Sequence, residues 1–252
     1  MRIARAMALA GVDSRRKCEL YIKNGEVGLN GEIIFDLGRQ VDIENDEMTF
    51  RGRALSFDRY VYYVLHKPKG YTTTALDPYA EKTVFELLPH KLAARTKNTA
   101  DRIRVFPVGR LDRDSTGLLL FTNDGELAHR LTHPRYGVGK WYQVRLGRAL
   151  DPRDAIRICR GVQLEDGTAK AEKLQSLSKR VIRILIREGK KREVRRIFEK
   201  VGYEVVDLCR ISFGPLILGT LAPRCGRFLS SSEIRHLKEA ATAALPKKPP
   251  SR

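Results

Sequence analysis

The sequence predicts an α+β protein: a small helix-helix-strand module followed by a larger domain in which helices flank a mixed, largely antiparallel sheet. Apolar residues recur at helical spacing twice before residue 25 and at strand spacing soon afterwards. Beyond residue 60, short apolar runs typical of strands alternate with polar turns and two amphipathic stretches typical of helices. With 252 residues, 42% of them apolar, the chain can fill one large core or two smaller ones.

Residues 1–55 are expected to form the smaller module. An apolar helical repeat over residues 3–10 stops at Gly11, and Asp13 or Ser14 can cap a second helix that ends at Gly25. The Asn30-Gly31 pair is a strong hairpin signal. Short strands are expected around it, at residues 27–29, 41–43 and 48–50. Residues 56–60 are predicted to link this module to the rest of the chain.

Residues 61–237 are predicted to form the larger domain. The apolar strand that starts at Tyr62 should stop at Pro68, because proline cannot donate a hydrogen bond to a neighbouring strand. Asp124 can cap a short helix. Further elements are expected as strands at residues 105–108, 118–121, 141–146 and 181–186, an exposed basic loop at 90–104 and an amphipathic helix at 190–201. Residues 238–252 are predicted to be a disordered basic tail.

The charge of the chain favours a polyanionic partner. Its 48 lysine and arginine residues against 30 acidic ones give a formal charge of +18, an excess typical of proteins that bind nucleic acid or an anionic membrane. A membrane is disfavoured, because no apolar stretch approaches the ~20 residues of a span and the N-terminus lacks a signal-peptide pattern. We therefore expect no membrane partner.

The cysteines and glycines give no sign of a metal or a nucleotide cofactor. The 4 cysteines are scattered, without a C-x-x-C pair or metal-ligand spacing to histidine. Such thiols are typical of reduced, cytoplasmic proteins. The chain contains neither G-x-G-x-x-G nor a lysine-containing phosphate loop. We therefore expect a cytoplasmic protein with no metal and no cofactor.

The segment from Gly109 to Gly125 places one carboxylate, that of Asp112, in a polar turn between two apolar runs. Functional side chains are concentrated on loops held by rigid elements, and this turn has that arrangement. The alternative is that Asp112 only hydrogen-bonds within its own turn. Trp141 and Tyr142 should point to opposite faces of their strand, so at most one of them can share a site with Asp112.

Two cationic clusters are candidate phosphate contacts. Arg15, Arg16 and Lys17 occupy the first turn of the second helix, where the helix dipole disfavours each cation by about 0.3–1 kcal/mol. Such a helix start favours an external anion such as phosphate. Residues 180–200 carry nine cations against three acidic residues, which favours contact with an RNA backbone. The alternative for both clusters is an ordinary solvated face.

Several motifs together resemble one enzyme family. The segments VLHKPKGYTTTALDP, GRLDRDSTGLLLFTNDG, KWYQVRL and EGKKREVRRIFEK occur in this order, and over residues 2–235 the chain resembles the RsuA-like bacterial ribosomal RNA pseudouridine synthases. Among them it is most similar to the RluB-like enzymes of the large ribosomal subunit. The segment GVDSRRKCELYIKNGEVGLNG resembles the S-four-type RNA-binding module over residues 2–50.

The resemblance implies an activity and a set of site residues. It makes Asp112 of the G-R-L-D motif the catalytic nucleophile, Tyr142 of the K-x-Y strand the residue that packs on the target base, and Arg195 the partner of the aspartate. The R-Q-V-R-R motif reads REVRR here, with Glu193 in the place of glutamine. We further expect Arg110 to bind substrate. The residues expected to contact RNA are Arg15, Arg16, Lys17, Lys67, Arg192 and Arg196.

The expected reaction is site-specific isomerisation of uridine to pseudouridine in ribosomal RNA. An ionised aspartate can act as a nucleophile without a metal, and the target uridine must leave the stacked helix to reach it. We expect the partner to be ribosomal RNA or pre-ribosomal particles, of the large subunit rather than the small, and the protein to be a monomer. The alternatives are a small-subunit substrate, a non-catalytic RNA-binding or ribosome-assembly protein, and a nucleic-acid hydrolase, which would normally need a second carboxylate or a metal cluster.

Overall fold

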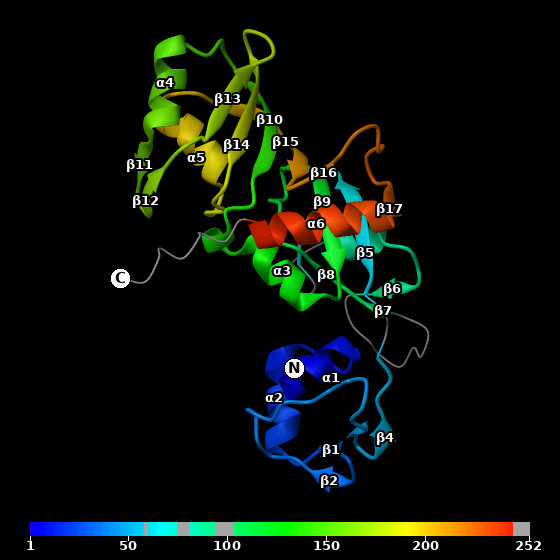
Figure 1. Ribbon diagram of the computed structural model, residues 1–252. Helices are drawn as coiled ribbons and strands as arrows, with labels where there is room; N and C mark the ends of the chain where they lie inside the picture. The colour runs from blue at the N-terminus through cyan, green and yellow to red at the C-terminus, as the bar shows by residue number, and fades with distance from the viewer. Residues whose placement is uncertain (58–59, 75–80, 94–102, 244–252) are drawn as a thin grey trace, which may run out of the picture. The chain divides into compact units, whose positions relative to one another are not determined.

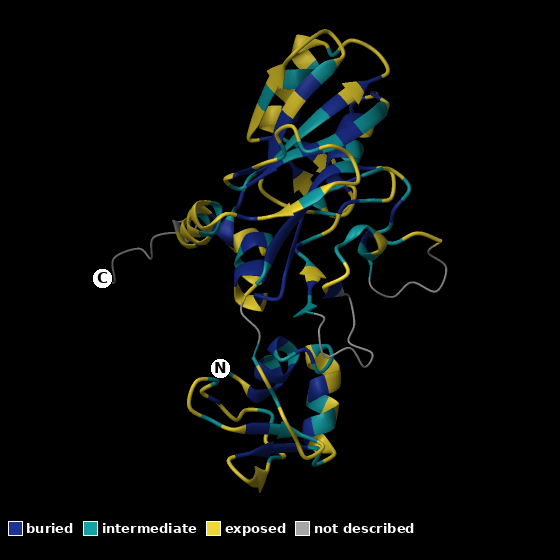
Figure 2. Cartoon of the chain, turned by 90° about the vertical axis from the view of Figure 1, so that its right-hand side faces the viewer, coloured by how far each residue is buried: buried dark blue, intermediate teal, exposed yellow. Residues whose placement is uncertain are grey.

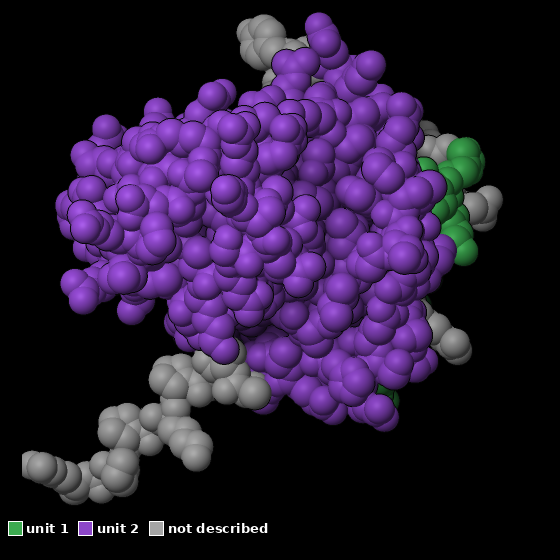
Figure 3. All heavy atoms as spheres, turned by 90° about the horizontal axis from the view of Figure 1, so that it is seen from above, with its two compact units in different colours: residues 1–61, 88–106 green, residues 62–87, 107–252 purple. Residues whose placement is uncertain are grey.

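The computed structural model describes residues 1–57, 60–74, 81–93 and 103–243. The chain divides into two compact units, one made of residues 1–61 and 88–106 and the other of residues 62–87 and 107–252 (Figure 3). Each unit has its own hydrophobic core.

The first unit contains the two helices and the small sheet expected from the sequence. Helix α1 (Ile3–Leu9) is followed by α2 (Arg15–Lys23), and the Ser14 side chain caps α2 by accepting a hydrogen bond from the Lys17 amide. The sheet has the strand order β2-β1-β3-β4, with all pairs antiparallel. Its strands are β1 (Val27–Leu29), β2 (Glu32–Ile33), β3 (Met48–Phe50) and β4 (Arg53–Ala54).

The hairpin between β1 and β2 turns at Asn30 and Gly31, whose φ angles are 51° and 86°. Positive φ at both positions is what a tight primed turn requires, which is why this residue pair predicts a hairpin. The strand expected at residues 41–43 is absent. The Val41 amide instead donates to the Met1 carbonyl, and the backbone there forms only an isolated bridge between Arg2 and Gln40.

The second unit is built on one mixed sheet with the main strand order β13-β14-β10-β15-β9-β5-β17 (Figure 1). Among the described pairs of this sheet, only β9 and β15 run parallel. The expected mixed, largely antiparallel sheet is therefore confirmed. The strands are β5 (Tyr62–Lys67), β8 (Phe106–Pro107), β9 (Thr116–Thr122), β10 (Lys140–Leu146), β13 (Lys173–Ser176), β14 (Val181–Ile186), β15 (Val205–Phe213), β16 (Leu216–Ile217) and β17 (Gly226–Phe228).

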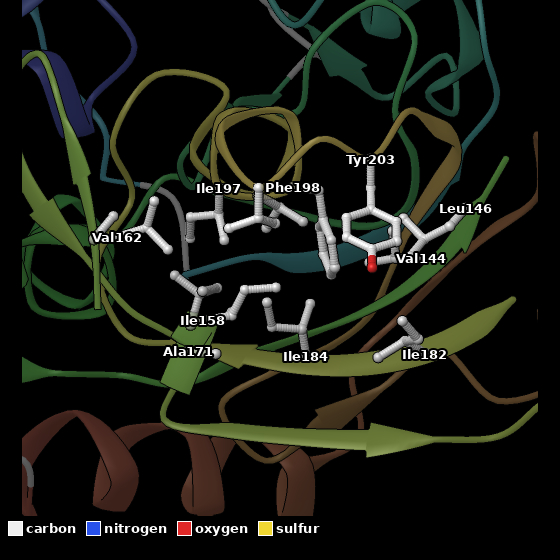
Figure 4. Packing of buried hydrophobic residues seen from close by; sticks show 14 of the residues in the cluster. Val144, Leu146, Ile158, Val162, Ala171, Ile182, Ile184, Ile197, Phe198 and Tyr203 are labelled. Atoms are coloured by element: carbon white, nitrogen blue, oxygen red, sulfur yellow. The ribbon is translucent and has the colours of Figure 1, made fainter. Parts of the chain in front are cut away.

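Helices cover this sheet in two groups, each with its own cluster of buried side chains (Figures 1 and 2). Helices α3 (Gly125–Thr132) and α6 (Ser231–Ala243) pack against strands β5 and β9. Helices α4 (Pro152–Arg160) and α5 (Glu193–Lys200) pack against β10 and β14, where Ile197 and Phe198 of α5 meet Val144 and Ile184 of the sheet (Figure 4). The shorter elements of the unit are the hairpin β11 (Val162–Leu164) and β12 (Gly167–Ala169) and the 3-10 turns η1 (Val84–Leu87) and η2 (Pro134–Tyr136).

Two element boundaries differ from those that the sequence predicts. Helix α5 begins at Glu193 rather than at residue 190, because the preceding Arg192 has a left-handed backbone with φ 52°. Helix α6 continues to Ala243, so residues 238–243 are helical and not part of a disordered tail; Leu237 and Ala241 are buried on it. Residues 244–252 lie outside the described residues.

Residues 88–106, which the sequence placed in the larger domain, belong to the first unit. Strands β6 (Leu92–Ala93) and β7 (Ile103–Arg104) pair there in parallel. Most of the basic loop expected at this place, residues 94–102, lies outside the described residues, as do residues 58–59 of the expected linker. Among the described helices, none combines the length and the apolar character that a membrane span requires.

The parallel contact between β9 and β15 depends on Gly117. A Cβ atom at this position would lie 2.3 Å from the Arg210 carbonyl oxygen and 2.5 Å from its amide nitrogen, and the φ angle of Gly117 is 110°. Both neighbours are backbone atoms, so the two strands would have to move apart to admit a side chain.

We predict that Gly117→Ala lowers the free energy of unfolding of the second unit by about 3 kcal/mol or more, from backbone strain and overlap together. Gly219→Ala is the matched control, since Gly219 also has positive φ but open space around its Cβ position; strain alone should cost about 1–2 kcal/mol. Urea titration followed by the fluorescence of Trp141, the 1 tryptophan of the chain, measures both. Equal losses of unfolding free energy in the two variants would contradict the close contact between Gly117 and the Arg210 backbone.

Candidate active site

The turn that carries Asp112 is held through its backbone carbonyl groups. Between β8 and β9, the side chain of Lys67 donates to the carbonyl oxygens of Asp112 (3.0 Å), Arg113 (3.3 Å) and Ser115 (2.7 Å). The hydroxyl of Thr73 donates to the carbonyl of Leu111 at 2.8 Å, just before the aspartate. This anchoring fixes the position from which the Asp112 side chain projects.

Lys67 is not an RNA contact, contrary to the expectation from the sequence. It is the last residue of β5 and is 0% exposed, so its amine cannot reach an external phosphate. Burial lowers the pKa of Lys67 to about 8, opposed by the Asp112 and Asp114 carboxylates. The amine therefore still carries its proton at neutral pH, as its hydrogen bonds to backbone carbonyls require.

Arg195 also supports the turn rather than the Asp112 carboxylate. From helix α5, the half-buried Arg195 donates to the carbonyl of Val205 on β15 (2.8 Å) and to that of Asp114 (3.3 Å). In the described part of the chain, the Asp112 carboxylate has no ion pair, with Arg195 or with any other residue. Arg195 thus joins α5 to the turn, and the carboxylate is left free for a ligand.

Asp112 lies at the edge of a pocket of about 540 Å³ within the second unit. This volume is within the range of pockets that bind small molecules or a single extruded nucleotide. The pocket is lined by residues of the turn, of β10, of β15, of α3 and of the loop before α5, including Arg110, Asp112, Thr132, Lys140, Tyr142, Arg192, Glu193, Arg210 and Phe213. The structure therefore brings Arg110, Asp112, Tyr142 and Arg192 of the expected site residues together.

Tyr142 is placed by strand register. It lies opposite Ile184 of β14 and opposite Arg210 of β15, so these three side chains share one face of the sheet. Tyr142 lines the pocket and its neighbour Trp141 does not, as the alternation along a strand predicts. The half-buried ring of Tyr142 is thus available to a flat ligand in the pocket.

Two buried cations of the pocket wall were not among the expected site residues. Arg210 is 2% exposed, and its Nε atom donates to the Leu118 carbonyl at 2.8 Å. The Lys140 amine donates to the Glu188 carbonyl at 3.0 Å, and burial lowers its pKa to about 8. The sequence does carry a signal for Arg210, because it occupies an inward position between the buried residues Leu208 and Ser212 of β15.

The loop before α5 forms another wall. Glu193 is buried, which raises its pKa, and its carboxylate accepts a hydrogen bond from the Lys190 amide at 3.1 Å. Arg192 is exposed at the pocket, with its guanidinium 3.9 Å from the Asp114 carboxylate. Arg110 is also exposed and lines the pocket from the Asp112 turn.

The remaining expected contacts lie away from the pocket lining. Arg196 forms a bidentate ion pair with Asp166 and also donates to the Lys191 carbonyl at 3.1 Å, so its guanidinium is already engaged. Arg15, Arg16 and Lys17 are exposed on α2 of the first unit. Arg15 pairs with Glu19 and Lys17 with Asp13, at 3.3 Å each. In the described ranges, no group of three or more histidine, cysteine or acidic side chains is arranged to hold a metal ion.

We predict that Lys67→Met loosens the Asp112 turn. Three carbonyl oxygens of the turn would lose a charged donor inside the protein, which should lower the free energy of unfolding by at least ~2 kcal/mol. Backbone amide hydrogen exchange of residues 111–117 should accelerate. Lys69→Met is the matched control, because Lys69 is exposed and pairs only with Asp207; its loss should change stability by less than about 1 kcal/mol. Unchanged exchange in Lys67→Met would show that the lysine does not hold the turn.

Comparison with known proteins points to one enzyme family. The family model described as RNA pseudouridylate synthase matches residues 61–200. A relative from Bacillus subtilis, named ribosomal large subunit pseudouridine synthase B, is 38% identical over 247 residues, covering 95% of this chain and 96% of the relative. A relative from Aquifex aeolicus, named an uncharacterized RNA pseudouridine synthase, is also 38% identical, over 95% of this chain and 94% of its own length.

The fold agrees as well. A crystal structure of a pseudouridylate synthase superimposes with a TM-score of 0.65 at 28% identity, covering 94% of this chain and 99% of the other. The match includes the mixed sheet that carries the pocket, and it confirms the resemblance indicated by the G-R-L-D, K-x-Y and REVRR motifs. This chain belongs to the RNA pseudouridylate synthase family.

Proposed function

We propose that this protein converts a specific uridine of ribosomal RNA into pseudouridine, with Asp112 as the nucleophile. The observation that carries the proposal is the Asp112 carboxylate, which has no ion pair among the described residues and lines a pocket together with Tyr142, on a turn held by Lys67. The name of the Bacillus subtilis relative favours large-subunit RNA over small-subunit RNA as the substrate.

The reaction suits one carboxylate in a confined pocket. The glycosidic bond between ribose C1′ and uracil N1 must break, the uracil must turn, and C5 must form the new bond to C1′. The ribose carbon is inaccessible in a stacked helix, so the uridine has to enter the pocket extruded from the RNA. The Asp112 carboxylate then meets the ribose, either by bonding to C1′ or by taking a proton from the sugar.

Tyr142 supplies a flat surface for the extruded base. Stacking on an aromatic ring is worth about 1–3 kcal/mol and does not depend on sequence, so it can keep the detached uracil in the pocket while it turns. Arg195 has a different role from the one that the resemblance implies: by donating to the Asp114 carbonyl it positions the turn, and acts on the reaction through Asp112.

RNA outside the pocket would meet cations on both units. Arg110 and Arg192 are exposed on the pocket lining and can contact the phosphates that flank the target nucleotide. Arg15, Arg16 and Lys17 form an exposed cationic start to α2 in the first unit, which we propose as a further phosphate contact. Arg196 contributes less, because Asp166 neutralises it. The monomeric state, the cytoplasmic location and binding to pre-ribosomal particles stay predictions.

The test of the proposal is release of tritium from uracil C5, measured with the purified protein and ribosomal RNA from a strain that lacks it. We predict that Asp112→Asn lowers the rate by at least about 10⁴-fold, as loss of a nucleophile should, and leaves RNA affinity within about threefold. Asp114→Asn, which removes a carboxylate two residues away outside the pocket lining, should stay within about threefold of the wild-type rate. Full activity of Asp112→Asn would refute the role of Asp112, and RNA binding without tritium release by the wild-type protein would favour a non-catalytic RNA-binding protein.

A further inference from the structure

The guanidinium of Arg210 is buried without enough hydrogen-bond acceptors. Its Nε atom donates to the Leu118 carbonyl, but within the described part of the chain neither terminal nitrogen has an acceptor. The residue is 2% exposed, so water does not replace the missing partners at Nη2. Buried donors of a charged group are almost always satisfied, which indicates that a ligand completes this site.

The register of the sheet places Arg210 beside the surface offered by Tyr142. The two residues are directly opposite each other on β10 and β15, where facing side chains lie about 4.5–5.5 Å apart at Cβ. On its other side Arg210 is paired with Gly117, whose missing side chain lets the two backbones approach closely. The ring of Phe213 lies 5.1 Å from the guanidinium carbon. The edge of the guanidinium is thus the polar group that a flat molecule stacked on Tyr142 would meet.

Positive charge is concentrated around this position. The charge of Arg210 contributes to the lowered pKa of both Lys67 and Lys140, after the larger effect of burial. The Lys67 amine is bonded to backbone carbonyls of the Asp112 turn, and the Lys140 amine is bonded to a backbone carbonyl of the loop before α5. Arg210 is the cation of this group that has a buried nitrogen atom, Nη2, without any acceptor in the described part of the chain.

We propose that Arg210 donates hydrogen bonds to a carbonyl oxygen of the target uracil and stabilises the negative charge that uracil carries once its bond to ribose has broken. This inference rests on the proposed function. When the C1′–N1 bond breaks, its electron pair stays on uracil N1 and spreads onto O2 and O4. C5 then bonds to C1′, the hydrogen on C5 leaves as a proton, and N1 gains a proton. Uracil is an anion between these steps whether Asp112 bonds to C1′ or removes a sugar proton.

A buried cation fits this anion better than it fits a phosphate. Preorganised donors stabilise charge most strongly where water is excluded, and Arg210 is among the most deeply buried polar residues of the wall. The flanking phosphates of an extruded nucleotide lie towards the mouth of a pocket, where the exposed Arg110 and Arg192 can meet them. Arg210 is thus proposed as a catalytic residue that touches the base.

The experiment combines variants of Arg210 with altered carbonyl groups on the target. A synthetic ribosomal RNA fragment carries uridine, 2-thiouridine or 4-thiouridine at the target position, mapped beforehand with the wild-type enzyme. Single-turnover rates of pseudouridine formation and RNA dissociation constants are measured for the wild type, Arg210→Met, Arg210→Lys and Arg157→Met. Arg157 is the matched control, because it is an exposed arginine on α4 that does not line the pocket.

Arg210→Met should lower the single-turnover rate about 10²–10³-fold, as loss of a preorganised donor to an oxyanion does, while the dissociation constant changes by less than about threefold. Arg210→Lys, which keeps the charge on a shorter side chain, should recover part of the rate, and Arg157→Met should match the wild type.

Sulfur is a poor hydrogen-bond acceptor, so one of the two thiouridines should slow the reaction of the wild type roughly tenfold. The same substitution should have no further effect on Arg210→Met.

Equal effects of the thiouridines on the wild type and on Arg210→Met would overturn the inference, because no contact to the carbonyl would then be lost. A loss confined to the dissociation constant would show that Arg210 holds a phosphate instead. A rate loss in Arg210→Met without any thiouridine effect on the wild type would show that Arg210 acts through the Asp112 carboxylate.

If Arg210→Met fails to fold, a thiouridine effect that is smaller in Arg210→Lys than in the wild type supports the contact, and an equal effect refutes it. Absence of any reaction by the wild type on unmodified RNA would refute the proposed function itself.

Discussion

The site depends on the way in which a buried lysine holds the backbone of one turn. Lys67 ends strand β5 and donates to three carbonyl groups between Asp112 and Ser115, and Thr73 and Arg195 hold the carbonyls of Leu111 and Asp114. Successive carbonyl groups of residues 111–115 therefore have a donor from elsewhere in the fold. A carboxylate on such a turn keeps its place when a large polyanion binds, and a displacement of about 1 Å at a reacting group can cost 10²-fold in rate.

The cations of this protein divide into three groups by burial. Lys67, Lys140 and Arg195 are bonded to backbone carbonyls and hold the loops around the pocket. Exposed cations on the pocket lining and on α2 are accessible to phosphates, and some of them form surface ion pairs. Arg210 belongs to neither group, since it is buried with donors to spare. The same residue types thus serve structure, binding and chemistry according to their surroundings.

Local patterns predicted much of the fold. Ser14 and Asp124 cap their helices as expected, and the Asn30-Gly31 pair forms the hairpin, because capping and tight turns depend on adjacent residues. The burial of Lys67 could not be predicted in this way: its acceptors are 45 to 48 residues away in the chain, and only the pairing of β5 with β9 brings them together. The late start of α5, at Glu193 and not at residue 190, depends likewise on the left-handed backbone of Arg192, which no periodicity reveals.

The same distinction, between patterns of adjacent residues and contacts of residues far apart in the chain, applies to the site. The resemblance of the motifs to one enzyme family predicted that Asp112 and Tyr142 share a site, and both line the pocket. Alternation along β10 by itself predicted only that Trp141 and Tyr142 point to opposite faces of the strand. The contacts of Arg195 to Val205 and Asp114, and the pairing of Arg210 with Tyr142 and Gly117, require β15 to lie between β10 and β9. These depend on strand order, which a single sequence does not contain.

The proposed role of Asp112 in making pseudouridine in ribosomal RNA is tested most directly by mapping pseudouridine in that RNA. RNA is taken from a strain that lacks the protein and from the same strain complemented with the wild-type or the Asp112→Asn gene. We predict that one large-subunit pseudouridine is absent from the deletion strain, returns with the wild-type gene and stays absent with the variant. An unchanged pseudouridine map in the deletion strain, or restoration by Asp112→Asn, would contradict it.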